Sequence, residues 1–187
     1  MDTKAIEYHV AGLLRAIGED PEREGLRETP ERVARMLSEV LEGTAYSNHE
    51  IAQMFGKTFS MSGDQDSAVV MKDITVFSYC EHHLALMYDM KVNVGYIPNG
   101  KVLGLSKIAR ICDMAAKRLQ LQERLGSDIA DIIAEAADTE DVAVMISGCH
   151  SCMTARGIRN ASAKTVTSVF RGRFRSDPEL KKLVAFD

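Results

Sequence analysis

The stretch Lys91-Val92-Asn93-Val94-Gly95-Tyr96 alternates apolar side chains with polar or small ones, which is the two-residue period of a β-strand. A turn sequence, Pro98-Asn99-Gly100, then directs the chain into a second strand. Further strands are predicted at residues 68–71, 74–77, 142–146 and 165–170, and helices at about 106–119 and 121–137. Because these elements do not follow a regular βαβ order, the sequence predicts an α+β protein with a mainly antiparallel sheet.

The N-terminal third of the chain has a different character. Apolar residues from Ile6 to Ile17 recur at helical spacing, and a second helix is predicted to begin at Thr29-Pro30-Glu31, where a capping residue precedes a proline. Residues 50–66 have a mixed composition and are predicted to be a connection. We therefore expect an N-terminal helical arm and connection over residues 1–66, and the main body of the protein over residues 67–187.

Composition limits the functional classes. The chain has 187 residues, 45% hydrophobic and 27% charged, which is the balance of a globular protein. A net charge of -4 does not suit a general nucleic-acid binder, so an anionic ligand would need a local cationic pocket. No apolar run approaches the roughly 20 residues of a membrane span, and the N-terminus lacks a signal-peptide pattern. We expect a cytoplasmic protein with no membrane or nucleic-acid partner, whose four cysteines are thiols or metal ligands.

The segment Cys80-Glu81-His82-His83 carries the most reactive side chains of the sequence. A cysteine and a histidine three residues apart cannot share a face of a strand, but they can do so on a turn. Cys80 and His83 at this spacing suit a tetrahedral zinc ion. His82 must then point elsewhere, which leaves it available for proton transfer beside the metal.

The second reactive segment is Cys149-His150-Ser151-Cys152, at the end of an apolar strand. If that strand continues, His150 and Cys152 face one side of the sheet and Cys149 faces the other. Three extended steps would separate Cys149 and Cys152 by roughly 10 Å, beyond the reach of a disulfide. This geometry also disfavours a redox dithiol site.

Together the two segments offer three metal ligands: Cys80, His83 and Cys152. Three protein ligands with water in the fourth position are typical of catalytic zinc. His82 and His150 are then candidates for moving protons. From spacing alone, a structural zinc site with Cys149 or His82 as fourth ligand stays open as an alternative.

Longer motifs run in order along nearly the whole chain and are similar to those of a known family. They are Ala16–Pro21 (AIGEDP), Gly25–Arg32 (GLRETPER), Cys80–Leu84 (CEHHL), Gly95–Asn99 (GYIPN), Gly104–Ile111 (GLSKIARI), Arg118–Leu125 (RLQLQERL), His150–Met153 (HSCM), Arg156-Gly157 and Lys164–Ser168 (KTVTS). On these motifs the chain resembles the GTP cyclohydrolase I family. It departs from the family pattern at residues 85–90, where a proline and a short glycine-containing turn are common, and at Cys149.

The resemblance implies hydrolysis of GTP to formate and 7,8-dihydroneopterin triphosphate, the first step of tetrahydrofolate and related pterin biosynthesis. It implies the tunnelling fold, an antiparallel sheet backed by helices, with an N-terminal helical extension. It further implies a homodecamer with active sites between subunits, and leaves allosteric regulation open. The implied zinc ligands are again Cys80, His83 and Cys152, and the implied proton-handling residues are His82 and His150.

The resemblance also assigns residues to the substrate. Glu123 can accept hydrogen bonds from the ring N–H and exocyclic amine of guanine together, and Gln122 beside it can contact other base edges. Cations and free N–H groups at a helix start suit a triphosphate. The residues assigned to the phosphates are Ser106, Lys107, Arg110 and Arg156.

The expected mechanism assigns separate steps to the two histidines. Zinc-activated water attacks C8 of guanine while His150 protonates the adjacent ring nitrogen, and His82 assists opening of the ribose before the pterin ring closes. Two rival functions stay open. A non-catalytic zinc-stabilised binding protein would show a four-ligand site and no turnover, whereas a sister enzyme would act on a related purine or pterin.

Overall fold

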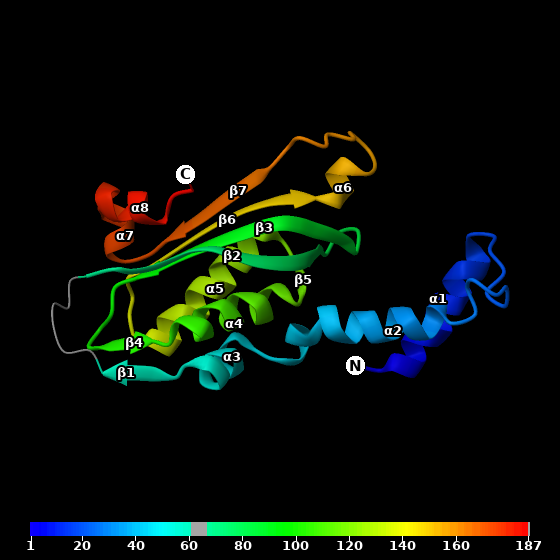
Figure 1. Ribbon diagram of the computed structural model, residues 1–187, viewed down its shortest axis with the longest axis horizontal. Coiled ribbons are helices and arrows are strands. Elements are labelled where there is room, and N and C mark those ends of the chain that lie inside the picture. Colours follow the sequence, from blue (N-terminus) through cyan, green and yellow to red (C-terminus); the bar gives the residue numbers. More distant parts are fainter. Residues whose placement is uncertain (61–66, 187) are drawn as a thin grey trace.

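The computed structural model describes residues 1–60 and 67–186 of the chain, and a curled five-stranded sheet forms its centre (Figure 1). The strand order is β5-β2-β3-β6-β7. The antiparallel neighbours are β2 (Val69–Cys80), β3 (Ala85–Tyr96), β6 (Val142–His150) and β7 (Thr165–Phe170). Short β5 (Leu119–Gln120) pairs in parallel with the end of β2, and β1 (Thr58–Ser60) and β4 (Lys101–Leu103) form a separate two-stranded sheet.

Helices cover both faces of the main sheet. On one face lie α4 (Leu105–Ala116) and α5 (Gln122–Ala137), with α3 (Asn48–Phe55) packed against them (Figure 1). On the other face, α7 (Arg173–Ser176) and α8 (Pro178–Val184) cover one end of the sheet. The predicted α+β class, with a mainly antiparallel sheet backed by helices, is confirmed. Among the described residues, no helix is both long and apolar enough to cross a membrane.

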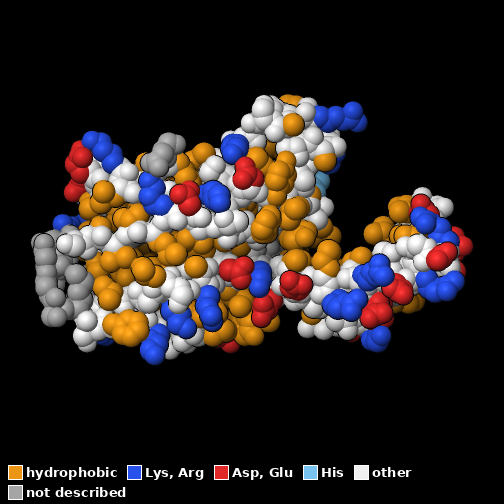
Figure 2. All heavy atoms as spheres, viewed as in Figure 1, with side chains coloured by type: hydrophobic (Ala, Val, Ile, Leu, Met, Phe, Trp, Pro, Cys, Tyr) orange, Lys and Arg blue, Asp and Glu red, His pale blue; other side chains and the backbone are white. Residues whose placement is uncertain are grey.

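An arm of two helices projects beyond the sheet, as Figures 1 and 2 show. It consists of α1 (Thr3–Ala16) and α2 (Thr29–Val40), followed by the short 3-10 helix η1 (Glu42–Ala45). Both helices were predicted and are confirmed. No residue of α1 is buried, and Leu13 and Ile17 on its apolar side are 60% and 66% exposed. The single chain therefore leaves part of this apolar face uncovered.

The prediction of a connection over residues 50–66 is wrong for its first part. The side chain of Ser47 accepts from the backbone N–H of Glu50, and the Glu50 carboxylate accepts in return from the backbone of Ser47, which forms a capping box at the start of α3. Ile51 and Ala52 are then buried in the main core. Residues 61–66 of that predicted connection lie outside the described residues, and the division of the chain at residue 66 stays a prediction.

The alternating stretch at residues 91–96 lies in β3 as predicted, but both of its faces are buried. The reason is the C-terminal helix α8, which covers the face that alternation alone would leave in water. Asn93 accepts a hydrogen bond from the backbone N–H of Asp73 at 2.8 Å and donates one to the carbonyl of Val184 at 2.9 Å. A buried polar side chain thus joins β2, β3 and α8 with its hydrogen-bonding groups satisfied.

Candidate metal centre and active site

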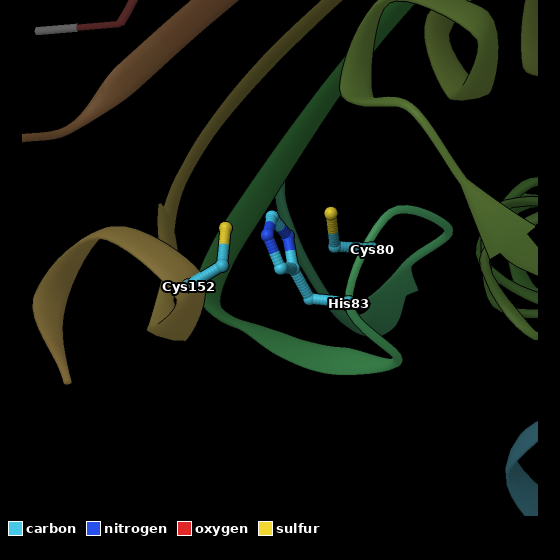
Figure 3. A group of neighbouring side chains, drawn as sticks. All are labelled: Cys80, His83 and Cys152. Carbon is cyan, nitrogen blue, oxygen red and sulfur yellow. The ribbon is translucent and has the colours of Figure 1, made fainter. Parts of the chain in front are cut away.

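Three elements bring the predicted metal ligands together. Cys80 is the last residue of β2, His83 lies in the turn at residues 81–84, and Cys152 lies in the first turn of α6 (Ser151–Thr154). One donor atom from each lies within 4.8 Å of the other two. Figure 3 shows the three side chains pointing toward one another. The structure therefore forms a Cys-His-Cys group that could hold a metal ion.

Sheet register explains how this group forms from distant segments. Cys80 pairs with Ala85, so the tight turn between them places His83 back beside the end of β2. Met87 of β3 pairs with His150, the last residue of β6, so the helix that follows β6 begins next to this turn. A hydrogen bond of 3.3 Å between the hydroxyls of Tyr88 and Thr154 joins β3 to α6.

The structure corrects the geometry expected around Cys152. The strand does not continue through this residue, because β6 ends at His150 and α6 begins at Ser151. Cys152 therefore reaches the group from a helical turn rather than by strand alternation. Cys149 is buried in β6, and all four cysteines are free thiols.

The donor set fits a zinc ion. With Zn–S bonds of about 2.3 Å, tetrahedral coordination sets two sulfur ligands about 3.8 Å apart. The three donor atoms lie within 4.8 Å of one another, and a movement of roughly 0.5 Å by each would bring them to this separation. Burial, and then the neighbouring Cys80, raise the pKa of the Cys152 thiol, since two adjacent thiolates repel each other. A divalent cation relieves that repulsion, so thiolate formation and metal binding favour each other.

Arg156 lies directly beside the metal ligands. Its Nη1 is 2.9 Å from Nε2 of His83, and its positive charge lowers the pKa of Cys152. The guanidinium is exposed, so it is also accessible to an anion at the mouth of the group.

The two predicted proton-handling histidines flank the metal group in different environments. His82 is exposed in the turn, with its ring centroid 6.3 Å from that of His83 and the planes at 85°. His150 is half-buried, and its Nε2 lies 2.9 Å from Oε1 of Gln122. Burial lowers the pKa of His150, while the nearby Glu123 carboxylate acts in the opposite direction.

The two residues predicted to contact guanine open α5 but differ in exposure. Glu123 is exposed, and its charge reaches His150. Gln122 is only 1% exposed, and its amide nitrogen donates to backbone carbonyls of β6 and β7. The expected contact of Gln122 with guanine stays a prediction, and it would have to use the remaining lone pair of Oε1.

A pair that the sequence did not assign connects the metal-binding turn to α5. The carboxylate of Glu81 accepts a hydrogen bond from Nη2 of Arg124, which also donates to the carbonyl of Leu119. Nε of the same arginine donates to Gln120. In the sequence, Glu81 and Arg124 are visible only as oppositely charged residues in two of the family motifs. Neither motif shows that the two side chains lie next to each other.

The remaining predicted phosphate residues lie elsewhere in the chain. Ser106 and Lys107 are in the first turn of α4, which follows β4, whereas β5 follows the other end of α4 and pairs with Cys80 (Figure 1). The 12 residues of α4 span about 18 Å. Arg110 is on the second turn. Within one chain, the structure does not bring these three residues to the metal group.

Comparisons with known proteins agree with these features. The family model for GTP cyclohydrolase I matches residues 6–186. The chain is 59% identical over 184 residues to GTP cyclohydrolase 1 of Ruminiclostridium cellulolyticum, covering 96% of this chain and 94% of that protein. It is 57% identical over 182 residues to GTP cyclohydrolase 1 of Clostridium botulinum strain Langeland, covering 95% and 93%. It is 55% identical over 189 residues to GTP cyclohydrolase 1 of Clostridium acetobutylicum, covering 99% of this chain and 97% of that protein.

Proposed function

The chain belongs to the GTP cyclohydrolase I family, and we propose that it hydrolyses GTP to formate and 7,8-dihydroneopterin triphosphate at the Cys80-His83-Cys152 group. Two findings together carry this proposal. The chain is 59% identical to a named GTP cyclohydrolase over 96% of its length, and its structure contains a Cys-His-Cys group suited to a metal. We place the reaction at the entry to tetrahydrofolate and related pterin synthesis in the cytoplasm.

We propose zinc as the metal held by Cys80, His83 and Cys152. The donor set of two thiolates and one imidazole is one that zinc prefers, and three ligands leave a coordination position for the reaction. When bound, zinc supplies Lewis acidity, which activates water for attack on carbon near neutral pH.

The chain's own residues supply base recognition and proton transfer in this proposal. The exposed carboxylate of Glu123 receives the two N–H groups on one edge of guanine. Burial lowers the pKa of His150, but this residue lies close enough to Glu123 for the carboxylate to act in the opposite direction. His150 exchanges a proton with the guanine ring nitrogen that is double-bonded to C8. His82, exposed on the same turn as His83, assists ribose opening after formate has left.

We propose that the triphosphate is bound by residues from more than one chain. Arg156 lies beside the metal group of its own chain, whereas Ser106, Lys107 and Arg110 lie at or near the start of α4. A site that uses all four needs α4 of a neighbouring subunit. The uncovered apolar side of α1 also favours contact between subunits, and we propose the homodecamer that the family resemblance implies.

Incubation of purified protein of known zinc content with GTP tests the proposed function. We expect release of one formate per GTP and the appearance of pterin fluorescence after oxidation of the product. The matched comparison is the Cys152→Ser variant, which removes one ligand and should form neither product. Full zinc occupancy without formate release would refute the catalytic proposal and favour a zinc-stabilised binding protein. Turnover of another purine in preference to GTP would favour a sister enzyme.

A further inference from the structure

The side-chain amide of Gln122 has its orientation fixed by the backbone around it. Nε2 is 3.1 Å from the carbonyl oxygen of Ile146 and 3.0 Å from that of Thr165. Backbone carbonyls only accept hydrogen bonds, so the amide atom facing both of them must be the nitrogen. Both amide hydrogens are thereby used, and a third contact of 3.3 Å to the hydroxyl of Thr167 lies on the same side.

This orientation determines which nitrogen of His150 carries a proton. The amide oxygen of Gln122 is 2.9 Å from Nε2 of His150, and an amide oxygen can only accept. Nε2 must therefore be the donor. In the neutral ring Nδ1 is then unprotonated and retains its lone pair.

The surroundings hold Gln122 in this one arrangement. Its side chain is buried, so water does not compete for the amide. Gly148 of β6 lies beside it: a Cβ atom at that position would be in ordinary contact with Oε1 of Gln122 at 3.4 Å, but would lie only 2.9 Å from Cγ of Met90. Gln122 is also the first residue of α5, and its amide reaches carbonyls on both β6 and β7.

We propose that Gln122 is a positioning residue that holds a proton on Nε2 of His150, so that Nδ1 is the nitrogen that exchanges protons with the reacting groups. This inference rests on the proposed function of the site. It differs from a base contact by Gln122, because the amide acts on the histidine rather than on guanine.

The proton balance of the first step follows from this assignment. Neutral His150 has no proton to give from Nδ1, so it must first accept one. As the water oxygen bonds to C8, one O–H bond of that water breaks and its proton goes to Nδ1. The same proton then passes from Nδ1 to the adjacent ring nitrogen of guanine, which takes up the electron pair of the former C–N double bond. His150 ends the step neutral, with its Nε2 proton still held by Gln122.

The direct test is the tautomer of His150 in the zinc-loaded protein. Solid-state NMR of protein labelled with 15N and 13C in histidine, recorded at mildly alkaline pH without GTP, distinguishes protonated from unprotonated ring nitrogens. Comparison with a His150→Ala sample identifies the His150 signals. We expect a protonated Nε2 and an unprotonated Nδ1 in the wild-type protein. A proton on Nδ1 would overturn the proposal, whether or not the protein turns over GTP.

Two buried glutamines provide matched variants for kinetics. Gln122→Met keeps the side-chain length but removes the acceptor for His150, whereas Gln120→Met removes a buried amide that bonds to Ala115, Asp128 and Nε of Arg124. In the Gln120→Met variant, Arg124 keeps its hydrogen bonds to Glu81 and to the carbonyl of Leu119. We expect Gln122→Met to populate both tautomers and to lower kcat by about 10- to 100-fold with little change in KM, the range found for residues that orient a metal-binding imidazole. Gln120→Met should keep the wild-type tautomer and a kcat within a few-fold of wild type.

The possible results separate the two proposals. A Gln122→Met variant with raised KM and unchanged kcat would indicate a base contact and would refute the positioning role. If this variant does not fold, as judged by circular dichroism and zinc content, the wild-type spectrum alone decides the assignment. A wild-type protein with the expected tautomer but no formate release would refute the proposed function and leave the placement of the proton intact.

Discussion

Replacement of Arg118 by methionine should destabilise the protein strongly, because this side chain joins the segment before α3 to the main body. Arg118 is 15% exposed and faces Asp128, which is 16% exposed. Its guanidinium donates to four groups: the carbonyls of Gly43 (3.1 Å) and Tyr46 (2.9 Å), and the side chains of Asn48 (2.7 Å) and Asp128 (3.2 Å). Methionine keeps much of the apolar stem and removes all four donors.

The expected loss of stability follows from the groups that lose Arg118 as a partner, above all the carboxylate of Asp128. Removal of one member of a buried ion pair typically costs about 3–5 kcal/mol of the free energy of unfolding. Asp128 would keep two hydrogen bonds, from Gln120 and Asn48, so the loss should fall near the lower end, about 3 kcal/mol. For a chain of this size that corresponds to a decrease of roughly 6–12 °C in Tm.

Urea unfolding followed by circular dichroism measures this loss, with zinc and protein concentration held equal because binding and assembly both change apparent stability. Lys182→Met is the control, since Lys182 and Glu179 form an ion pair whose side chains are 70% and 78% exposed. This pair should contribute below about 1 kcal/mol. A loss for Arg118→Met no larger than that of the control would refute the idea that this network holds the N-terminal segment to the body.

Two further predictions concern the metal group and the C-terminal helix. Cys152→Ser should lower bound zinc, measured by elemental analysis after dialysis, whereas Cys149→Ser should retain the wild-type zinc content; equal loss in both variants would contradict the ligand assignment. Asn93→Leu should lower the free energy of unfolding by about 2–3 kcal/mol because the N–H of Asp73 and the carbonyl of Val184 lose their partner. Relative to the wild type, this variant should show a larger increase in the hydrogen-exchange rate in α8 than in α5. Unchanged protection of α8 would contradict this explanation.

The sequence predicted the fold class and the metal group because both depend on local patterns. Alternation at residues 91–96 marked a strand, and the Cys80/His83 spacing required a turn, which the structure has. The capping box of α3 was also readable, since Ser47 and Glu50 are three residues apart before Ile51, but the surrounding mixed composition obscured it. Burial of both faces of β3 could not be read locally, because the cover comes from α8, about ninety residues later.

Cys152 lies in the predicted group, but it reaches that group by a geometry different from the predicted one. Alternation along an extended strand placed it on the side of His150, but the chain is helical from Ser151 onward. One helical turn still directs Cys152 to the end of β2, because the Met87–His150 register has already brought that end of β6 beside the turn. The residue type carried the prediction, and the strand pairing, which no single segment encodes, determined the geometry.

The role inferred for Gln122 depends on atoms that leave no trace in a sequence. Its amide is oriented by the backbone carbonyls of Ile146 and Thr165, and a residue of any type carries a backbone carbonyl, so the sequence does not mark these two acceptors. A glutamine next to Glu123 therefore looked like a second base contact. Only the convergence of α5, β6 and β7 shows that the amide nitrogen already donates to two backbone carbonyls and that the amide oxygen faces His150.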